Sequence, residues 1–568
     1  MKPKDKPCVV QSDSSILVET DHPGYESARD MLSTFAELVK SPEHIHTYQI
    51  SPISVWNACA AGLSSKSIID TLKKFSRYDL PQNVLYNIRD YTRRYGLLSL
   101  FTDDSANLVL SCSDANIFKE ICNQSNISSF FESPPSIDRV MVKKRFRGDL
   151  KLRLLKLGFP VDDIAGYVKG EPLSFKLRKD TLSNTTFNFR DYQRDSMEIF
   201  YAGGTNRGGS GIIVLPCGAG KTIVGIGVMN RLKTSTLIIT ANITALRQWI
   251  QELLDKTTLT PDQIGEYSGH KREIKPVTIA TYQILVYRKD RNQDFPHFKL
   301  FESRNWGLII YDEVHLLPAP VFRVTADIQA RRRLGLTATL IREDGKEDEV
   351  FSLIGPKKYD VPWKVLEKQG WIAEAECFEI KLPLNDIDRV KYIMADKRDK
   401  FRISSENPLK FSLVEKIIAN HRGEQILIIG QYLRQLRALK KIVNAPIITG
   451  QTPASRRDEL YQKFRQGEEQ ILIVSKVANF AVDLPDASVA VQISGTFGSR
   501  QEEAQRLGRI LRPKLRNQAS FYSLVSRDSV EQDFATKRQM FLTEQGYSYH
   551  IYDVDTFQSQ LLTKAERV

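Results

Sequence analysis

Short apolar runs rich in β-branched residues alternate with helix-like segments from about residue 186 to residue 526. Runs that are apolar on both faces and separated by helical stretches are typical of parallel strands covered by helices. The first block has runs at 211–216, 235–240, 276–281, 307–312 and 333–339, and the second has runs at 425–430, 445–450, 470–475, 489–494 and 520–526. The pattern predicts an α/β fold with two parallel-sheet lobes.

The first 185 residues follow a different pattern, with more helix-like segments and fewer buried runs, so we expect a mostly helical or α+β region there. A turn-forming segment, "SPPS" at 133–136, marks a boundary inside this region. The predicted domains are an N-terminal domain at 1–130, a basic module or linker at 131–185, a first lobe at 186–365, a second lobe at 366–545 and a C-terminal tail at 546–568.

Length, composition and charge argue against several classes of protein. The chain has 568 residues, which is too long for one core, and no apolar run approaches the ~18 residues of a membrane span. The N-terminal residues lack the apolar segment of a signal peptide. The six cysteines form no C-x-x-C pair, which argues against a zinc ribbon or an iron–sulfur cluster and suits a reducing compartment. A net charge of +13 favours a polyanionic partner.

A glycine-rich turn, "LPCGAGKT" at 215–222, lies between an apolar run and a helix-like segment. Such a turn leaves backbone N–H groups free to cradle phosphate oxygens, and the helix N-terminus adds partial positive charge. Lys221 would reach the terminal phosphates and Thr222 would ligate Mg²⁺. The turn departs from the strict phosphate-loop pattern, because Leu215 stands where the first glycine would be. The expected backbone contacts are at Gly218, Ala219 and Gly220.

The stretch "WGLIIYDEVHLLPAP" at 306–320 places two acids directly after a buried run. Asp312 would end a strand at the same sheet edge as Lys221, where its carboxylate can hold Mg²⁺. Glu313 would orient and deprotonate the water that attacks the γ-phosphate. We interpret His315 as a group that couples the nucleotide to the second lobe.

Further polar residues are placed to complete this site. Gln193 has an amide that would bind the adenine edge, and Thr337 and Thr339 would link the nucleotide site to neighbouring segments. Ordinary hydrogen bonding at a strand end is the alternative for the threonines. In the second lobe, Asp483 is a polar contact or a simple loop residue.

The segment "GSRQEEAQRLGRILRP" at 498–513 carries polar residues spaced three or four apart, close to one helix face. A solvated basic face is the usual explanation for such a stripe. Converging arginines would also stabilise charge on a γ-phosphate across a cleft, as an arginine finger does. The residues concerned are Gln505, Arg506, Arg509 and Arg512.

In order along the chain, Gln193, "GAGKT", "TYQ", "DEVH", "TAT" and "QRLGRILR" resemble the motifs of superfamily 2 helicases. Within that superfamily, "DEVHLLPAPVFR", "LGLTATLIREDG" and "FGSRQEEAQRLGRILRPK" resemble the xeroderma pigmentosum group B (XPB) family. The N-terminal segment at 41–81 is also similar to that family, and the chain looks most like its compact bacterial members. A specific mark of the family is the tripeptide Arg342, Glu343 and Asp344.

This resemblance implies RecA-like lobes, ATP and Mg²⁺ as cofactors, and ATP-driven 3′-to-5′ movement on DNA with strand opening in excision repair. Arg342 and Asp344 would act in strand separation. The partner is DNA at single-strand/duplex junctions, a nuclease is a further candidate partner, no membrane is expected, and the implied location is the cytoplasm at the nucleoid. The family also implies a thumb-like segment, for which the candidate is 388–408, and a damage-recognition-like module, for which the candidate is 138–168 within the basic module at 131–185.

A basic cluster lies in the module before the first lobe, and with Phe146 it would grip phosphates unless it is only a solvated helix face. Its members are Lys143, Lys144, Arg145, Arg147, Lys151, Arg153 and Lys156. The overall prediction is a DNA-dependent ATPase and 3′-5′ helicase. A duplex translocase without processive unwinding and a binding scaffold with a degenerate ATPase remain alternatives, and a restriction motor is a weaker one.

Overall fold

The computed structural model describes residues 6–40, 44–205, 208–290, 295–328, 331–339, 347–475, 487–495, 503, 507–508, 518–547 and 549–565. Two compact units divide the chain, one made of 1–37, 47–215 and 220–361, the other of 38–46, 216–219 and 362–568. Among the described residues, no helix has the length and apolar character needed to cross a membrane.

A four-stranded sheet in the order β1-β2-β4-β3 begins the N-terminal region, and helices α1–α4 accompany it. Two of these helices start with Ser–Ser capping boxes, at Ser51 and Ser64. The elements are β1 (Cys8–Val10), β2 (Ser15–Glu19), α1 (Tyr25–Leu32), β3 (Glu37–Lys40), β4 (Ile45–Gln49), α2 (Pro52–Ala60), α3 (Ser65–Phe75) and α4 (Gln82–Arg94).

A second four-stranded sheet, in the order β7-β6-β5-β8, crosses the boundary predicted at 130. Strand β6 pairs with β5 on one side and with β7 on the other, so residues 98–163 form one module. This sheet spans the boundary expected from the sequence, because "SPPS" lies in the segment that leads into β7. The elements are β5 (Leu98–Thr102), β6 (Leu108–Cys112), α5 (Ala115–Cys122), α6 (Ser125–Ser128), β7 (Arg139–Val142), α7 (Arg147–Lys156) and β8 (Val161–Asp163).

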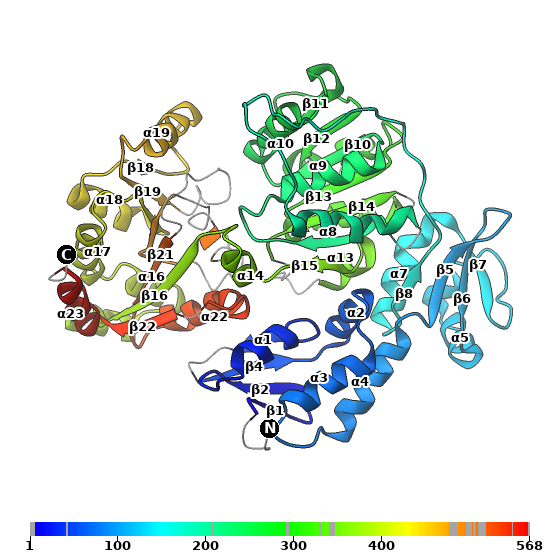
Figure 1. The fold of residues 1–568 in the computed structure, drawn as a ribbon, viewed down its shortest axis with the longest axis horizontal. Coiled ribbons are helices and arrows are strands. Elements are labelled where there is room, and N and C mark those ends of the chain that lie inside the picture. The colour runs from blue at the N-terminus through cyan, green and yellow to red at the C-terminus, as the bar shows by residue number, and fades with distance from the viewer. Residues whose placement is uncertain are drawn as a thin grey trace. The chain divides into compact units, whose positions relative to one another are not determined.

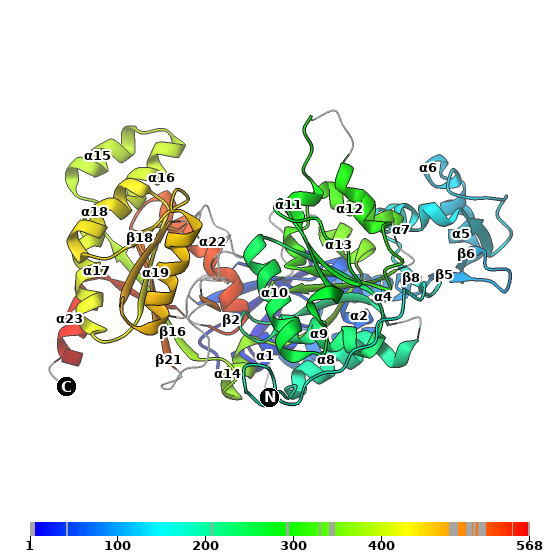
Figure 2. The same cartoon turned by 90° about the horizontal axis from the view of Figure 1, so that it is seen from above.

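The first lobe is a seven-stranded parallel sheet in the order β11-β12-β10-β13-β14-β9-β15. Helices α8–α10 lie on one face and α11–α13 on the other (Figure 2). Its strands are β9 (Ser210–Val214), β10 (Thr236–Thr240), β11 (Ile264–Tyr267), β12 (Val277–Thr281), β13 (Leu308–Asp312), β14 (Arg332–Thr337) and β15 (Lys357–Asp360). Its helices are α8 (Asp191–Tyr201), α9 (Lys221–Leu232), α10 (Ile243–Lys256), α11 (Tyr282–Leu285), α12 (Ala319–Asp327) and α13 (Glu347–Leu353).

The second lobe is also a seven-stranded parallel sheet, in the order β18-β19-β17-β20-β21-β16-β22. Figure 1 labels β18, β19, β21, β16 and β22 of this sheet. Strand β22 pairs with β16, so the predicted C-terminal tail contributes an edge strand to this lobe. Its strands are β16 (Glu374–Leu382), β17 (Ile426–Gly430), β18 (Ile447–Ile448), β19 (Ile471–Ser475), β20 (Val489–Gln492), β21 (Gln518–Ser526) and β22 (Tyr549–Asp553). Its helices are α14 (Trp363–Lys368), α15 (Asp386–Met394), α16 (Lys397–Ser405), α17 (Leu409–Asn420), α18 (Leu433–Val443), α19 (Ala454–Gln466), α22 (Val530–Glu544) and α23 (Val554–Ala565).

Every predicted apolar run lies on a strand of the predicted lobe, which confirms the α/β fold class. Both faces of the central strands are buried, because side chains alternate across the sheet. In β13, Ile309 and Tyr311 belong to the core shared with α12 and α13, whereas Ile310 lies beside Gly225 of α9. The thumb-like segment at 388–408 falls on the two helices α15 and α16.

Candidate active site

Three neighbouring strands of the first lobe end at one edge of the sheet. The order β13-β14-β9 places the end of β14 between the end of β13 and the loop that follows β9. Ligands of open α/β sheets bind at such carboxyl edges. Asp312 ends β13, Thr337 ends β14, and the glycine-rich turn connects β9 to α9.

The glycine-rich turn has a backbone that needs glycine. Gly218 and Gly220 have φ of +80° and +82°, in the left-handed region that disfavours other residues. A Cβ on Gly220 would also lie 2.6 Å from Nε2 of Gln193, so that amide packs against the turn. Helix α9 begins at Lys221 and has Thr222 in its first turn, so its free N–H groups point to the same edge.

Gln193 is only 4% exposed. Its Oε1 accepts a hydrogen bond from the backbone N–H of Arg190 at 3.0 Å, which fixes the side chain at the start of α8. The described contacts therefore place this amide beside the turn at Gly220. Its binding to adenine stays a prediction.

The two acids of "DEVH" occupy different environments. Asp312 is 9% exposed, and burial followed by the nearby charge of Glu313 raises the pKa of its carboxyl to about 6. Glu313 has a φ of +49°, which is strained for a residue with a Cβ. This backbone turns its carboxylate toward Lys221, whose Nζ lies 3.4 Å from Glu313 Oε1.

His315 joins the acidic turn to the end of β14. Its Nδ1 lies 2.7 Å from Oγ1 of Thr337 and 3.5 Å from Oε2 of Glu313. The hydroxyl of Thr337 donates to the carbonyl of Thr339 at 2.5 Å, and it accepts from the N–H of Thr339 at 3.1 Å. With the single hydroxyl proton of Thr337 directed to Thr339, the tautomer of His315 that fits this arrangement donates from Nδ1. The two threonines and the histidine thus form one connected chain of hydrogen bonds.

Two aromatic residues that the sequence analysis did not single out hold Asp312. The indole Nε1 of Trp249 donates to Oδ2 of Asp312 at 2.9 Å, and the hydroxyl of Tyr282 donates to the Asp312 carbonyl at 3.0 Å. Trp249 lies on α10, 63 positions earlier in the chain, so no local pattern indicates the contact. Tyr282 belongs to the "TYQ" motif, so the sequence marked its segment but did not indicate its contact with Asp312.

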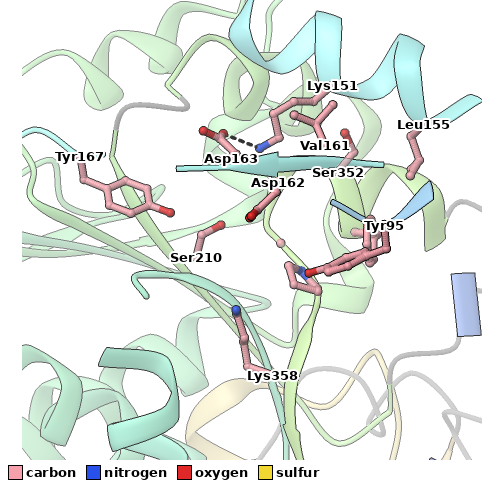
Figure 3. A pocket seen from close by; sticks show the side chains of 13 residues that line it. Tyr95, Lys151, Leu155, Val161, Asp162, Asp163, Tyr167, Ser210, Ser352 and Lys358 are labelled. Atoms are coloured by element: carbon pink, nitrogen blue, oxygen red, sulfur yellow. Dashed lines mark hydrogen bonds and ion pairs between the residues drawn. The ribbon is translucent and has the colours of Figure 1, made fainter. Parts of the chain in front are cut away.

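The structure corrects the predicted basic cluster at two positions. Arg147 and Lys151 are buried, and both bind Asp163: the guanidinium donates at 2.7 and 3.1 Å and the ammonium at 3.0 Å. Figure 3 shows Lys151 and Asp163 at the wall of a cavity of about 70 Å³ between the module and the first lobe. These two cations neutralise a buried carboxylate and are not available to DNA.

The remaining cations of the cluster differ in exposure. Lys144 and Arg145 are exposed, whereas Lys143 donates to the carbonyl of Ser129 at 2.9 Å. Phe146 packs on Phe130, with ring centroids 5.0 Å apart, and beneath the guanidinium of Arg145. It is therefore part of the module's packing. Arg153 and Lys156 are exposed on α7.

Several predicted residues lie outside the described residues. They are Arg342, Glu343 and Asp344 of the first lobe, and Asp483, Gln505, Arg506, Arg509 and Arg512 of the second.

Three family models match this chain. Residues 366–565 match the ERCC3/RAD25/XPB C-terminal helicase, 8–132 match a helicase conserved C-terminal domain, and 186–342 match the type III restriction enzyme res subunit.

Curated relatives match over nearly the full length. A "DNA 3′-5′ helicase XPB" of Kineococcus radiotolerans is 50% identical, with 97% of each chain covered. The protein of the same name from Mycobacterium tuberculosis is 50% identical, with 97% of this chain and 98% of that one covered. A "General transcription and DNA repair factor IIH helicase/translocase subunit XPB" of Enterocytozoon bieneusi is 34% identical, covering 96% and 92%.

Proposed function

We propose, from the premise that this chain belongs to the XPB family of DNA helicases, that it is an ATP-dependent 3′-5′ DNA helicase. The observation that supports the chemistry most directly is the Lys221–Glu313 pair beside the buried Asp312. This arrangement puts a phosphate-binding cation, a candidate base and a candidate metal ligand at one sheet edge. Hydrolysis in the first lobe would drive strand opening.

The residues at this edge fit a Mg²⁺ nucleotide. Asp312 and Glu313 bring two carboxylates together, and Lys221 is the nearby described cation that lowers the pKa of Asp312. A pair of carboxylates short of positive charge favours a divalent cation. Asp312 and Thr222 would hold it, and when bound it would neutralise charge on the phosphates.

Lys221 and Glu313 would change partners during a cycle. In the structure the Lys221 ammonium and the Glu313 carboxylate form an ion pair. Binding of Lys221 to phosphate oxygens would release the Glu313 carboxylate, which would then orient water and accept its proton. Because Glu313 also lies near His315, the change would reach Thr337 and Thr339 through the hydrogen-bond chain. Arg342 and Asp344, which follow this strand end, would respond in strand separation.

The second lobe would complete the site. Gln505, Arg509 and Arg512 match the helicase motif "QRLGRILR", and they would stabilise charge on the γ-phosphate when the lobes close on DNA. DNA would then stimulate hydrolysis. An arginine finger typically contributes roughly 10³–10⁵ in turnover, so basal activity without DNA should be low.

A second candidate is duplex translocation without processive unwinding. The name of the Enterocytozoon bieneusi relative joins helicase and translocase, which favours testing both activities. Displacement of the third strand of a triplex without separation of a tailed duplex would support translocation. The same name includes DNA repair, and we extend the proposal to opening DNA around lesions in excision repair.

The deciding experiment measures phosphate release with and without DNA, together with strand separation on duplexes that carry a 3′ or a 5′ single-stranded tail. We expect DNA-stimulated phosphate release and separation of the 3′-tailed duplex. Lys221→Ala should abolish both activities, whereas Glu302→Gln, an exposed charge change in the same lobe, should preserve them. Wild-type protein without DNA-stimulated phosphate release would contradict the proposed function.

A further inference from the structure

Trp249 is almost fully buried, at 1% exposure, and it crosses from α10 to the end of β13. Its indole donates to Oδ2 of Asp312 at 2.9 Å. Oδ1 of the same carboxylate accepts from the backbone N–H of Glu313 at 3.1 Å. A carboxylate has about four lone-pair sites, so these two bonds orient it and leave acceptor capacity on both oxygens.

The chemistry of the donor matters as much as its position. An indole N–H is neutral, so it fixes a carboxylate without cancelling its charge. An arginine or lysine in the same place would neutralise the carboxylate and compete with a divalent cation. Elsewhere in the same unit two cations bind Asp163 in that way. The indole therefore orients Asp312 and preserves its charge.

The opposite helix leaves space for the indole. A Cβ on Gly225 would lie 2.5 Å from Cη2 of Trp249 and 3.5 Å from Cδ1 of Ile310. Gly225 lies in the middle of α9, where glycine costs roughly 0.5–1 kcal/mol relative to alanine. Helix α9 thus has a glycine, which lowers helix stability, at the position where a larger residue would clash with the Trp249 indole.

We propose that Trp249 is a positioning residue for the metal-binding carboxylate of Asp312, and that Gly225 is required to seat it. The inference rests on the proposed function, since it assumes that Asp312 holds the cation of a bound nucleotide. It goes further by assigning a role to two residues outside the nucleotide-binding turn at 215–222. Residues that orient metal ligands typically contribute about 10–100-fold in metal affinity or activity.

The test measures Mn²⁺ affinity of the protein–ADP complex by electron paramagnetic resonance, which reports free Mn²⁺ without any turnover. Trp249→Phe keeps an aromatic ring but removes the N–H, and we expect Mn²⁺ to bind about ten-fold more weakly. Trp306→Phe is the matched control, because Trp306 is 0% exposed and its indole donates to the carbonyl of Leu300 at 2.9 Å. Its Mn²⁺ affinity should equal that of wild type.

Gly225→Ala provides a second variant that retains Trp249. The substitution normally stabilises a helix, so a purely structural glycine would leave metal affinity intact. We expect Mn²⁺ affinity to fall about as far as in Trp249→Phe. Should Trp249→Phe fail to fold, Gly225→Ala alone decides the matter.

Mn²⁺ affinity within two-fold of wild type in a folded Trp249→Phe or Gly225→Ala protein would overturn the assignment. Wild-type protein that binds no Mn²⁺ in the presence of ADP would instead contradict the proposed function itself. The two failures are therefore distinguishable.

Discussion

Two aspartates of the same unit, whose side chains are largely buried, have opposite surroundings. Asp163 accepts hydrogen bonds from Arg147 and Lys151. Figure 3 shows the bond from Lys151. Asp312 accepts them from an indole and from the backbone, and its nearest charged neighbour along the chain is Glu313. Burial alone would raise the pKa of both. The cations of Lys151 and Arg147 outweigh burial and hold the pKa of Asp163 below its usual range, whereas burial and Glu313 raise that of Asp312 to about 6.

The difference separates a carboxylate that is paired within the fold from the one that we propose to bind a cation. Asp163 has its charge balanced within the fold, and it joins α7 to β8 of the module. At Asp312, burial and Glu313 outweigh the nearby charge of Lys221, so the ionised form of this carboxyl is costly until a further cation arrives. Functional sites commonly retain such unfavourable charge at the expense of stability.

The largest expected effect comes from removing the second carboxylate at the active site. Glu313→Gln should retain ATP binding, because Lys221 and Asp312 remain, but the carboxamide cannot accept the proton of water. General-base catalysis contributes typically 10²–10⁴-fold, so DNA-stimulated turnover should fall by about that factor. Steady-state phosphate release at saturating DNA measures it, with Glu302→Gln as control. Turnover near the wild-type rate would remove Glu313 from the role of base.

The next effect is on folding. Asp163→Asn leaves Arg147 and Lys151 buried without a counter-charge, and breaking a buried ion pair in this way costs about 3–5 kcal/mol. Thermal unfolding should show a lower midpoint than Asp162→Asn, its half-buried neighbour. An equal midpoint for the two variants would mean that the Asp163 cluster does not stabilise the module.

The same substitution at Asp312 should have the opposite sign. The pKa of this carboxyl rises from 3.8 to about 6 in the fold, so its ionised form destabilises the protein above about pH 6, and that penalty fades as pH falls toward 4. Asp312→Asn removes the charge but mismatches one hydrogen bond, for a net gain of about 1–2 kcal/mol at pH 7.5. Unfolding midpoints of metal-free protein at pH 7.5 and pH 4.5 measure the gain, which should vanish at the lower pH. A gain that is the same at both pH values would contradict the electrostatic explanation.

The smallest effect concerns DNA binding. Since Arg147 and Lys151 are bound to Asp163, phosphate contacts of the module would rest on exposed residues such as Lys144 and Arg145. Replacing both by alanine should flatten the slope of log K against log salt by up to about 1.8, at about 0.9 for each phosphate contact on duplex DNA. The exposed pair Lys73 and Lys74 on α3 is the matched control. A slope equal to that of the control would indicate a solvated face.

The sequence predicted the residues at the carboxyl edge of the first-lobe sheet because short stretches of the chain determine them. Buried runs ending at Asp312 and Thr337, and a glycine turn before Lys221, follow from strand periodicity and backbone requirements. The contact of Trp249 with Asp312 depends on how α10 packs, which no short segment specifies.

The pairing of Arg147 and Lys151 with Asp163 also depends on how distant segments pack. Arg147 and Asp163 are 16 positions apart and meet only because α7 packs against β8. Likewise, β22 is the edge strand of the second sheet only through its pairing with β16, which its sequence did not indicate.

The most direct test of the account is the Mg²⁺ dependence of ADP affinity, measured by equilibrium titration with Mg²⁺ and with EDTA. If the Asp312 carboxylate is the acceptor of a nucleotide-bound cation, wild type should bind ADP about ten-fold more tightly with Mg²⁺, and Asp312→Asn should lose that difference. Asp162→Asn should keep it. A Mg²⁺ dependence in Asp312→Asn equal to that of wild type would contradict the claim that Asp312 is the carboxylate that awaits a cation.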